Sequence, residues 1–137
     1  MRIEVFSLCD AATADAGGKL NMLGAFDTIW VAKIPVVHPQ CAIALRLRFD
    51  AIERGDHKVT VNFVNSDGKH IIPPATGNIK VVFPDEQRSG SANLIFNIQG
   101  LKIEKPDVYS IDLAIDNKSE ASLPLYVKER KAGTRLQ

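Results

Sequence analysis

The sequence is poor in the features that mark several classes of protein. Two cysteines among 137 residues exclude the dense disulfide framework of a small secreted domain. The formal net charge is only +1, and the body of the chain shows no basic stripe of the kind that nucleic-acid binders carry. No segment approaches the roughly 20 apolar residues of a membrane span, and Glu4 interrupts the apolar N-terminus, unlike a signal peptide. We therefore expect a cytoplasmic protein without a nucleic-acid or membrane partner.

The overall composition is that of an ordinary soluble globular domain. Apolar residues make up 45% of the chain and charged residues 24%. A chain of 137 residues is long enough to bury a core of its own. Residues 128–137 hold four basic side chains and one acidic one, without apolar periodicity. We expect one domain over residues 1–127 and a basic, flexible C-terminal tail over residues 128–137.

The clearest local pattern lies near the C-terminus. Residues 106–116 begin with a proline and then alternate apolar and polar side chains, which predicts a half-buried strand. Asp116, Asn117 and Lys118 offer turn residues, and residues 121–127 return with the same alternation. The sequence therefore predicts a closing β-hairpin.

Similar alternation recurs along the whole chain without a helical window. It predicts further strands at residues 2–9, 19–33 (interrupted at Gly24), 41–49, 58–64, 78–83 and 92–98. The segments 34–39 and 101–106 resemble crossings between sheets. About eight or nine short strands separated by turns favour an all-β antiparallel β-sandwich, Ig-like or C2-like in form.

Tyr109 has a position that suggests a structural role. It follows a proline at the start of a late strand, as does the tyrosine corner of Greek-key sandwiches. We expect its hydroxyl to bond a nearby backbone group and to fix the preceding crossover.

The two cysteines are candidate nucleophiles. Cys9 and Cys41 occupy apolar strand positions, which favours buried free thiols over a disulfide. His38 lies three residues before Cys41, so a catalytic pair is an alternative. Since Cys41 begins a core-facing series and His38 lies among prolines, we predict no catalytic residue.

Metal and cofactor sites have little support. The histidines, His38, His57 and His70, lack the close spacing of zinc ligands. Acidic residues cluster weakly in turns where calcium could bind, but turn geometry alone explains Asp and Glu there. The sequence predicts neither a metal nor a cofactor.

Trp30 and the pair of arginines at residues 46 and 48 could each have a structural or a functional role. Trp30 lies between Ile29 and Val31, which favours core or interface packing over a carbohydrate platform. Arg46 and Arg48 alternate with core residues, so we expect them on a solvated strand face.

The chain resembles a family of uncharacterised small bacterial all-β proteins, a domain of unknown function. The resemblance rests on residues 4–12 (EVFSLCDAA), 18–27 (GKLNMLGAFD), 41–46 (CAIALR) and the closing segment 106–127. It implies a small cytoplasmic β-sandwich, and it transfers no activity and no site residue.

Function is therefore inferred from missing catalytic motifs and plain turn chemistry. The leading hypothesis is a non-catalytic protein-binding or assembly module that acts through sheet edges, loops or the tail. One alternative is a homo-oligomeric structural subunit with Trp30 and residues 71–74 at the interface. Another is a ligand-binding or enzymatic sandwich whose polar residues, including the three histidines, converge only in three dimensions.

Overall fold

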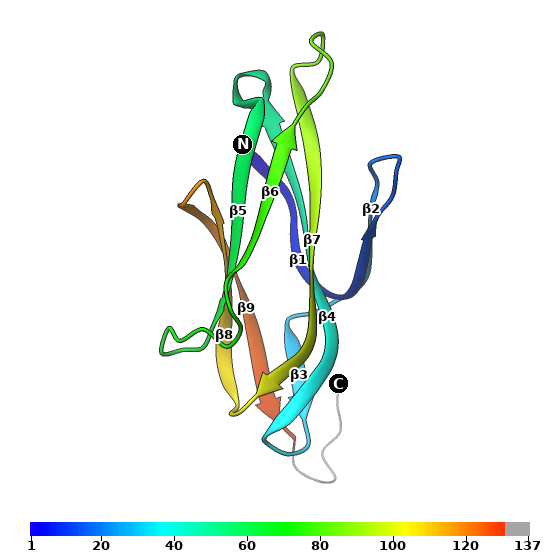
Figure 1. The fold of residues 1–137 in the computed structure, drawn as a ribbon. Coiled ribbons are helices and arrows are strands. Elements are labelled where there is room, and N and C mark those ends of the chain that lie inside the picture. Colours follow the sequence, from blue (N-terminus) through cyan, green and yellow to red (C-terminus); the bar gives the residue numbers. More distant parts are fainter. Residues whose placement is uncertain (131–137) are drawn as a thin grey trace.

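The computed structural model describes residues 1–130, which form nine strands and one short 3₁₀ turn (Figure 1). The elements are β1 (Arg2–Ala14), β2 (Leu20–Ala25), β3 (Thr28–Val31), β4 (Val36–Asp50), η1 (Ala51–Glu53), β5 (Gly55–Val64), β6 (Ala75–Val81), β7 (Ser89–Ile103), β8 (Asp107–Ile115) and β9 (Lys118–Glu129). Among the described residues, no helix is long and apolar enough to span a membrane.

The strands form two sheets, which confirms the all-β prediction. One sheet has the order β2-β1-β4-β7 and the other the order β3-β9-β8-β5-β6. Each strand pair is antiparallel except β3 with β9, which is parallel, so the expectation of a wholly antiparallel fold is wrong at this edge. The exception arises because the chain changes sheets before β3, and β3 then runs beside the last strand in the same direction.

The predicted second strand, residues 19–33, is in fact two strands that belong to different sheets. The amide of Phe26 donates to Leu8 O in one sheet, whereas Asp27 O accepts from the Tyr126 amide in the other. Just before this crossing, Gly24 has a φ of 69°, and a Cβ there would lie 2.5 Å from Asp10 Oδ2. Glycine is therefore required at this position, although the pairing of β2 with β1 continues past it to Ala25.

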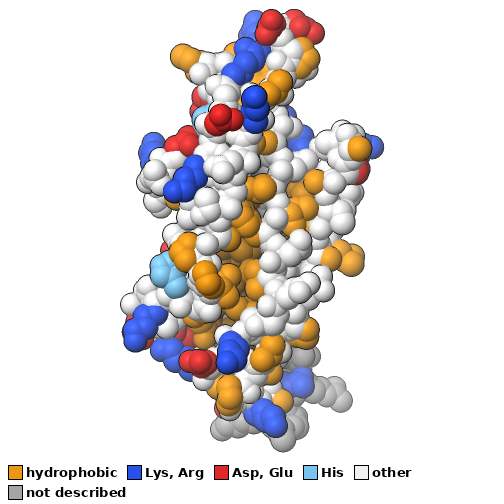
Figure 2. All heavy atoms as spheres, in the orientation of Figure 1, with side chains coloured by type: hydrophobic (Ala, Val, Ile, Leu, Met, Phe, Trp, Pro, Cys, Tyr) orange, Lys and Arg blue, Asp and Glu red, His pale blue; other side chains and the backbone are white. Residues whose placement is uncertain are grey.

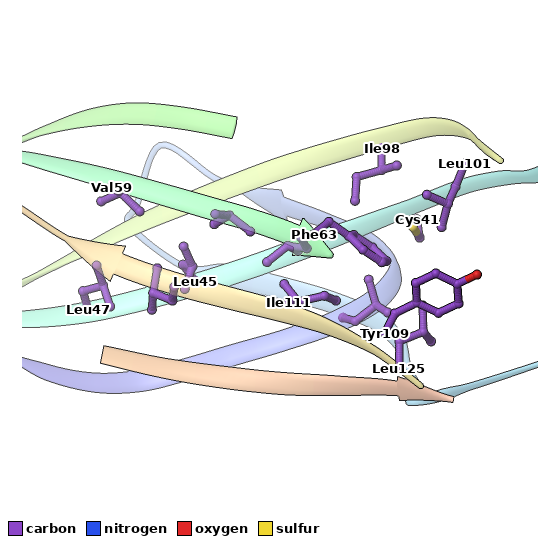
Figure 3. Packing of buried hydrophobic residues seen from close by; sticks show 14 of the residues in the cluster. Cys41, Leu45, Leu47, Val59, Phe63, Ile98, Leu101, Tyr109, Ile111 and Leu125 are labelled. Atoms are coloured by element: carbon purple, nitrogen blue, oxygen red, sulfur yellow. The ribbon is translucent and has the colours of Figure 1, made fainter. Parts of the chain in front are cut away.

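The main core lies between the two sheets, as the alternation predicted. Strand β4 contributes a run of inward side chains, and β5 and β8 contribute matching runs from the other sheet (Figure 3). The β4 set is Cys41, Ile43, Leu45, Leu47 and Phe49. Because successive side chains of a strand face opposite ways, one face of β4 fills this core.

The opposite face of β4 carries a second, smaller cluster. Cys9 packs there with Ala42 and Ala44, so it lies on the other side of the sheet from Cys41. Both cysteines are buried free thiols, which confirms the prediction of unpaired cysteines. Their placement on opposite faces of β4 explains why they form no disulfide.

The tyrosine-corner prediction for Tyr109 is confirmed. Its side chain is 3% exposed, and its hydroxyl donates to Lys105 O at 2.8 Å. Its ring also packs edge-on against Phe63, with 6.2 Å between ring centroids. The contact fixes the crossover from β7 to β8.

The C-terminal boundary differs slightly from the expected one. Strand β9 continues past Val127, since Lys128 pairs with Trp30 and Glu129 with Val31. These two residues of the predicted tail therefore belong to the sheet. Residues 131–137 lie outside the described part of the chain.

Candidate functional site

Strand β7 is an edge strand, and within residues 1–130 it pairs with β4 alone. Its residues 89–101 include neither a charged side chain nor a proline. Natural sheets usually protect long edges with charges, prolines or bulges, because the unpaired N–H and C=O groups can pair with another chain. We call the side of β7 that faces away from β4 the β7 edge.

The other three edge strands are much shorter. β2 has six residues, β3 four and β6 seven, against 15 in β7. β2 also bends at Gly24, and β6 carries the exposed Lys80. Short, bent or charged edges are poor templates for a further strand. The β7 edge is therefore the place in the described chain where an added strand would find the longest backbone template.

Apolar side chains line the side of the molecule next to the β7 edge. Leu94 and Phe96 of β7 are only partly buried although they pack on the main core. Leu94 lies over Gly77 of β6, where a Cβ would be 3.1 Å from Leu94 Cδ2. Figure 2 shows hydrophobic side chains as a lengthwise band between the β6 side and β7. This band would contact alternate side chains of a strand added along β7.

A polar network fastens β7 to the strands behind it. Glu4 of β1 accepts from Arg46 Nε at 2.9 Å and from Arg48 Nε at 2.7 Å. The same arginines donate to Asn93 Oδ1 and Ser89 Oγ of β7, both at 3.0 Å. The hydrogen bond from Arg48, assisted by both arginine charges, lowers the pKa of Glu4. Arg46 and Arg48 were expected on a solvated face, and they remain partly exposed while they hold β1, β4 and β7 in register.

A pocket of about 470 Å³ lies at the crossover from β7 to β8. We call it the basic pocket, because three lysines and one histidine line it against a single carboxylate. Its lining residues are Asn65, Lys69, His70, Ile71, Lys102, Glu104, Lys105 and Tyr109. They come from the loop after β5, the end of β7, the crossover that follows it and the start of β8, so the pocket joins the two sheets.

Exposed aromatic side chains gather on the outer face of the five-stranded sheet. Trp30 is 44% exposed and Tyr126 is 37% exposed, so of the two expected roles for Trp30, core or interface packing, the core role is wrong. The ammonium of Lys128 lies 5.4 Å from the Trp30 ring centroid and 5.8 Å from that of Tyr126. Because Ile29 and Val31 point inward, strand alternation directs Trp30 outward. An interface role for Trp30 stays a prediction.

The three histidines occupy separate places. His38 lines a shallow pocket with Trp30, and His70 lines the basic pocket. His57 stacks on Phe49, with 4.7 Å between ring centroids, at another site. Within residues 1–130, no group of three His, Cys, Asp or Glu side chains is placed to hold a metal ion.

Sequence reasoning missed the pairing of His57. Its Nδ1 lies 2.7 Å from Asp116 Oδ2, and its Nε2 contacts the backbone oxygen of Glu53. The bond to the Glu53 carbonyl, together with Asp116, raises the pKa of His57 despite partial burial. Asp116 was recognised only as a turn residue, because its partner is distant in sequence.

The proposed His38–Cys41 pair has no chemical support. Cys41 is 0% exposed, and burial raises the pKa of its thiol to about 11. A nucleophilic cysteine needs a thiolate that solvent or substrate can reach. Cys41 is therefore a core residue.

Comparison with known proteins gives a family and weak structural likenesses. The model of a family of unknown function, DUF6941, matches residues 4–128. A search of curated proteins finds no match.

Two solved structures show a weak likeness to this chain. The alkylpurine DNA glycosylase AlkC of Pseudomonas fluorescens, bound to DNA with an abasic-site analogue, has a TM-score of 0.43 and 9% identity over 74% of this chain. A glycoside hydrolase family 2 β-glucuronidase has a TM-score of 0.40 and 19% identity over 68% of this chain. The likeness covers only 28% of the first protein and 11% of the second.

Proposed function

Because the chain belongs to this family of unknown function, DUF6941, we propose its function from its own geometry. It is a non-catalytic protein-binding module that accepts an extended segment of a partner protein as an additional strand along the β7 edge. The observation that carries the proposal is a long edge strand, without charge or proline over residues 89–101, beside a partly exposed apolar band. In this mode of recognition, backbone hydrogen bonds give affinity and alternate side chains give specificity.

The order of the strands in the two sheets supports the same proposal. We propose an Ig-like sandwich, on the grounds of the parallel β3–β9 pair, the tyrosine corner before β8 and the order of the remaining strands. In the Ig arrangement A-B-E-D, β1, β4 and β7 correspond to A, B and E. No strand of residues 1–130 occupies the D position beyond β7. A partner segment would fill that position.

The structure also limits the chemistry of the segment. On β7 the apolar Leu94 and Phe96 point to the inner side, and the residues between and beside them, Asn93, Ile95 and Asn97, point to the outer side without a charge. A complementary strand has apolar residues at alternate positions and uncharged residues between them. A charge facing Leu94 or Phe96 would lose hydration without gaining a partner.

The test compares Asn97→Lys on β7 with Ser119→Lys on β9, since both place one lysine at an exposed strand position. Random peptides displayed on phage are selected against the full chain, and selected peptides are titrated against both variants. We expect alternating apolar peptides whose affinity falls at least about tenfold with Asn97→Lys, because a charged edge disfavours pairing. Ser119→Lys should bind as the parent does. Failure to select peptides, or equal binding by both variants, would refute the proposal.

Self-association is the second candidate, and the absence of charge over residues 89–101 of β7 favours it. Two copies can pair β7 with β7 antiparallel about a two-fold axis without placing like charges opposite each other. Light scattering should then show a dimer that Asn97→Lys converts to a monomer. A monomer at high concentration excludes this candidate.

A cytoplasmic location is part of the proposal. The low cysteine content supports it, because small secreted domains often depend on several disulfides.

A further inference from the structure

The basic pocket has walls that are tied together from both sides. Ser66 on the loop after β5 donates through its hydroxyl to Asp107 Oδ2 at 2.8 Å. Lys105 on the crossover lies 3.5 Å from Asp67 Oδ2 and 3.6 Å from Asp107 Oδ2. With the Tyr109 hydroxyl bonded to Lys105 O, the loop and the crossover form a fixed frame. A frame that is already ordered loses little entropy when a ligand binds.

One of the three lysines that line the pocket is ion-paired, and within the described chain the other two are not. Lys105 is engaged, and the nearby charges of Asp67 and then Asp107 raise its pKa. Lys69 and Lys102 have no carboxylate within ion-pair distance among residues 1–130. Glu104 is the one carboxylate in the lining. Two uncommitted ammonium groups therefore face one carboxylate.

Neutral donors add to this positive bias. Asn65 Oδ1 accepts from the amides of Asp67 and Lys69 at 2.9 and 3.0 Å, which leaves its side-chain NH₂ group to donate. His70 supplies a further ring nitrogen. Ile71 gives an apolar wall, and the volume of about 470 Å³ suits a small organic molecule rather than a bare ion.

We infer that the basic pocket binds an oxyanion, the carboxylate or phosphate group of a small molecule or of a chain end, held by Lys69, Lys102 and Asn65. This inference does not depend on strand addition at the β7 edge. Ammonium and amide donors bind both oxyanions by charge-assisted hydrogen bonds, so the shared chemistry is the prediction.

The test is an NMR titration of backbone amides in the full chain. Sodium phosphate and sodium acetate are the two probes, each at constant ionic strength with sodium chloride as the reference. The double variant Lys69→Met, Lys102→Met is compared with Lys80→Met, Lys118→Met, which removes two exposed lysines outside the pocket lining.

We expect saturable shifts at residues 65–71 and 102–105 with at least one probe. Removing both pocket lysines should weaken that binding at least about fivefold, since each exposed ion pair is worth up to about 1 kcal/mol. The control pair and Asn97→Lys should bind as the parent does. Saturation by phosphate alone assigns a phosphate ligand, and saturation by acetate alone assigns a carboxylate. Non-saturable shifts with both probes, or equal affinity in the two double variants, would overturn the inference.

Discussion

Removal of the Tyr109 hydroxyl should destabilise the protein although it leaves the aromatic core unchanged. Tyr109 is 3% exposed, and its hydroxyl donates to Lys105 O at 2.8 Å. The variant Tyr109→Phe keeps the ring that packs against Phe63 and removes only this donor. Lys105 O then loses its partner at the crossover.

The magnitude follows from two contributions. A typical intramolecular hydrogen bond contributes about 0.5–1.5 kcal/mol, and an acceptor left unsatisfied in a buried place costs about 1–3 kcal/mol. Since Lys105 itself is exposed, water partly satisfies its carbonyl, and the lower part of this range applies. We expect Tyr109→Phe to lower the free energy of unfolding by about 1–2 kcal/mol.

Urea denaturation monitored by fluorescence measures the effect. Tyr126→Phe is the matched control, because Tyr126 is 37% exposed and no hydrogen bond of its hydroxyl is found among the described residues. The midpoint should fall for Tyr109→Phe with an unchanged m-value, and the control should stay within about 0.5 kcal/mol of the parent. Equal stabilities of the two variants would show that the corner hydroxyl contributes nothing.

Further outcomes follow from glycine packing, proton binding and thiol burial. Gly90→Ala should lower stability by about 1–3 kcal/mol in the same denaturation assay, because its Cβ would lie 2.3 Å from Phe83 Cδ1. NMR titration should give His57 a pKa above its ordinary value of 6.5, lowered again in Asp116→Asn. The stability from His57 is then fully present below pH 6.5 and is lost as the pH rises through the raised folded-state pKa, so Asp116→Asn should flatten this part of the stability profile. A thiol reagent should label the two buried cysteines only after unfolding, and labelling of Cys41 in the native state would contradict its raised pKa.

Strands that bury one face were predictable because their pattern is local. β8 alternates strictly, and β4 does so over residues 45–50. The direction in which each of these side chains points is set by its position along its own strand. The role of Tyr109 was predictable for the same reason, since its hydroxyl reaches a carbonyl four residues earlier. Contacts between residues that are close in the sequence can therefore be predicted from the sequence.

Features that depend on which strands are neighbours could not be predicted from the sequence. The apolar runs of β2 and β3 look like one interrupted strand, yet hydrogen bonds to Leu8 and from Tyr126 place them in different sheets. The basic pocket joins Lys69 to Lys102, which are remote in sequence. Alternation specifies which way a side chain points, not which strand lies beside it.

The lack of charge on residues 89–101 of β7 is informative only because this strand lies at an edge. The neighbouring strand β4 has the same length and carries Arg46, Arg48 and Asp50, although β4 lies inside its sheet and has no edge to protect. If edge protection governed where charges fall, residues 89–101 of β7 would carry charges and β4 would need none. An uncharged, β-prone edge of this length would also promote aggregation if nothing covered it. Charged residues are therefore placed in the opposite way to that of a sheet whose edges are protected from pairing. This placement is expected if a further strand covers the β7 edge in the functional protein.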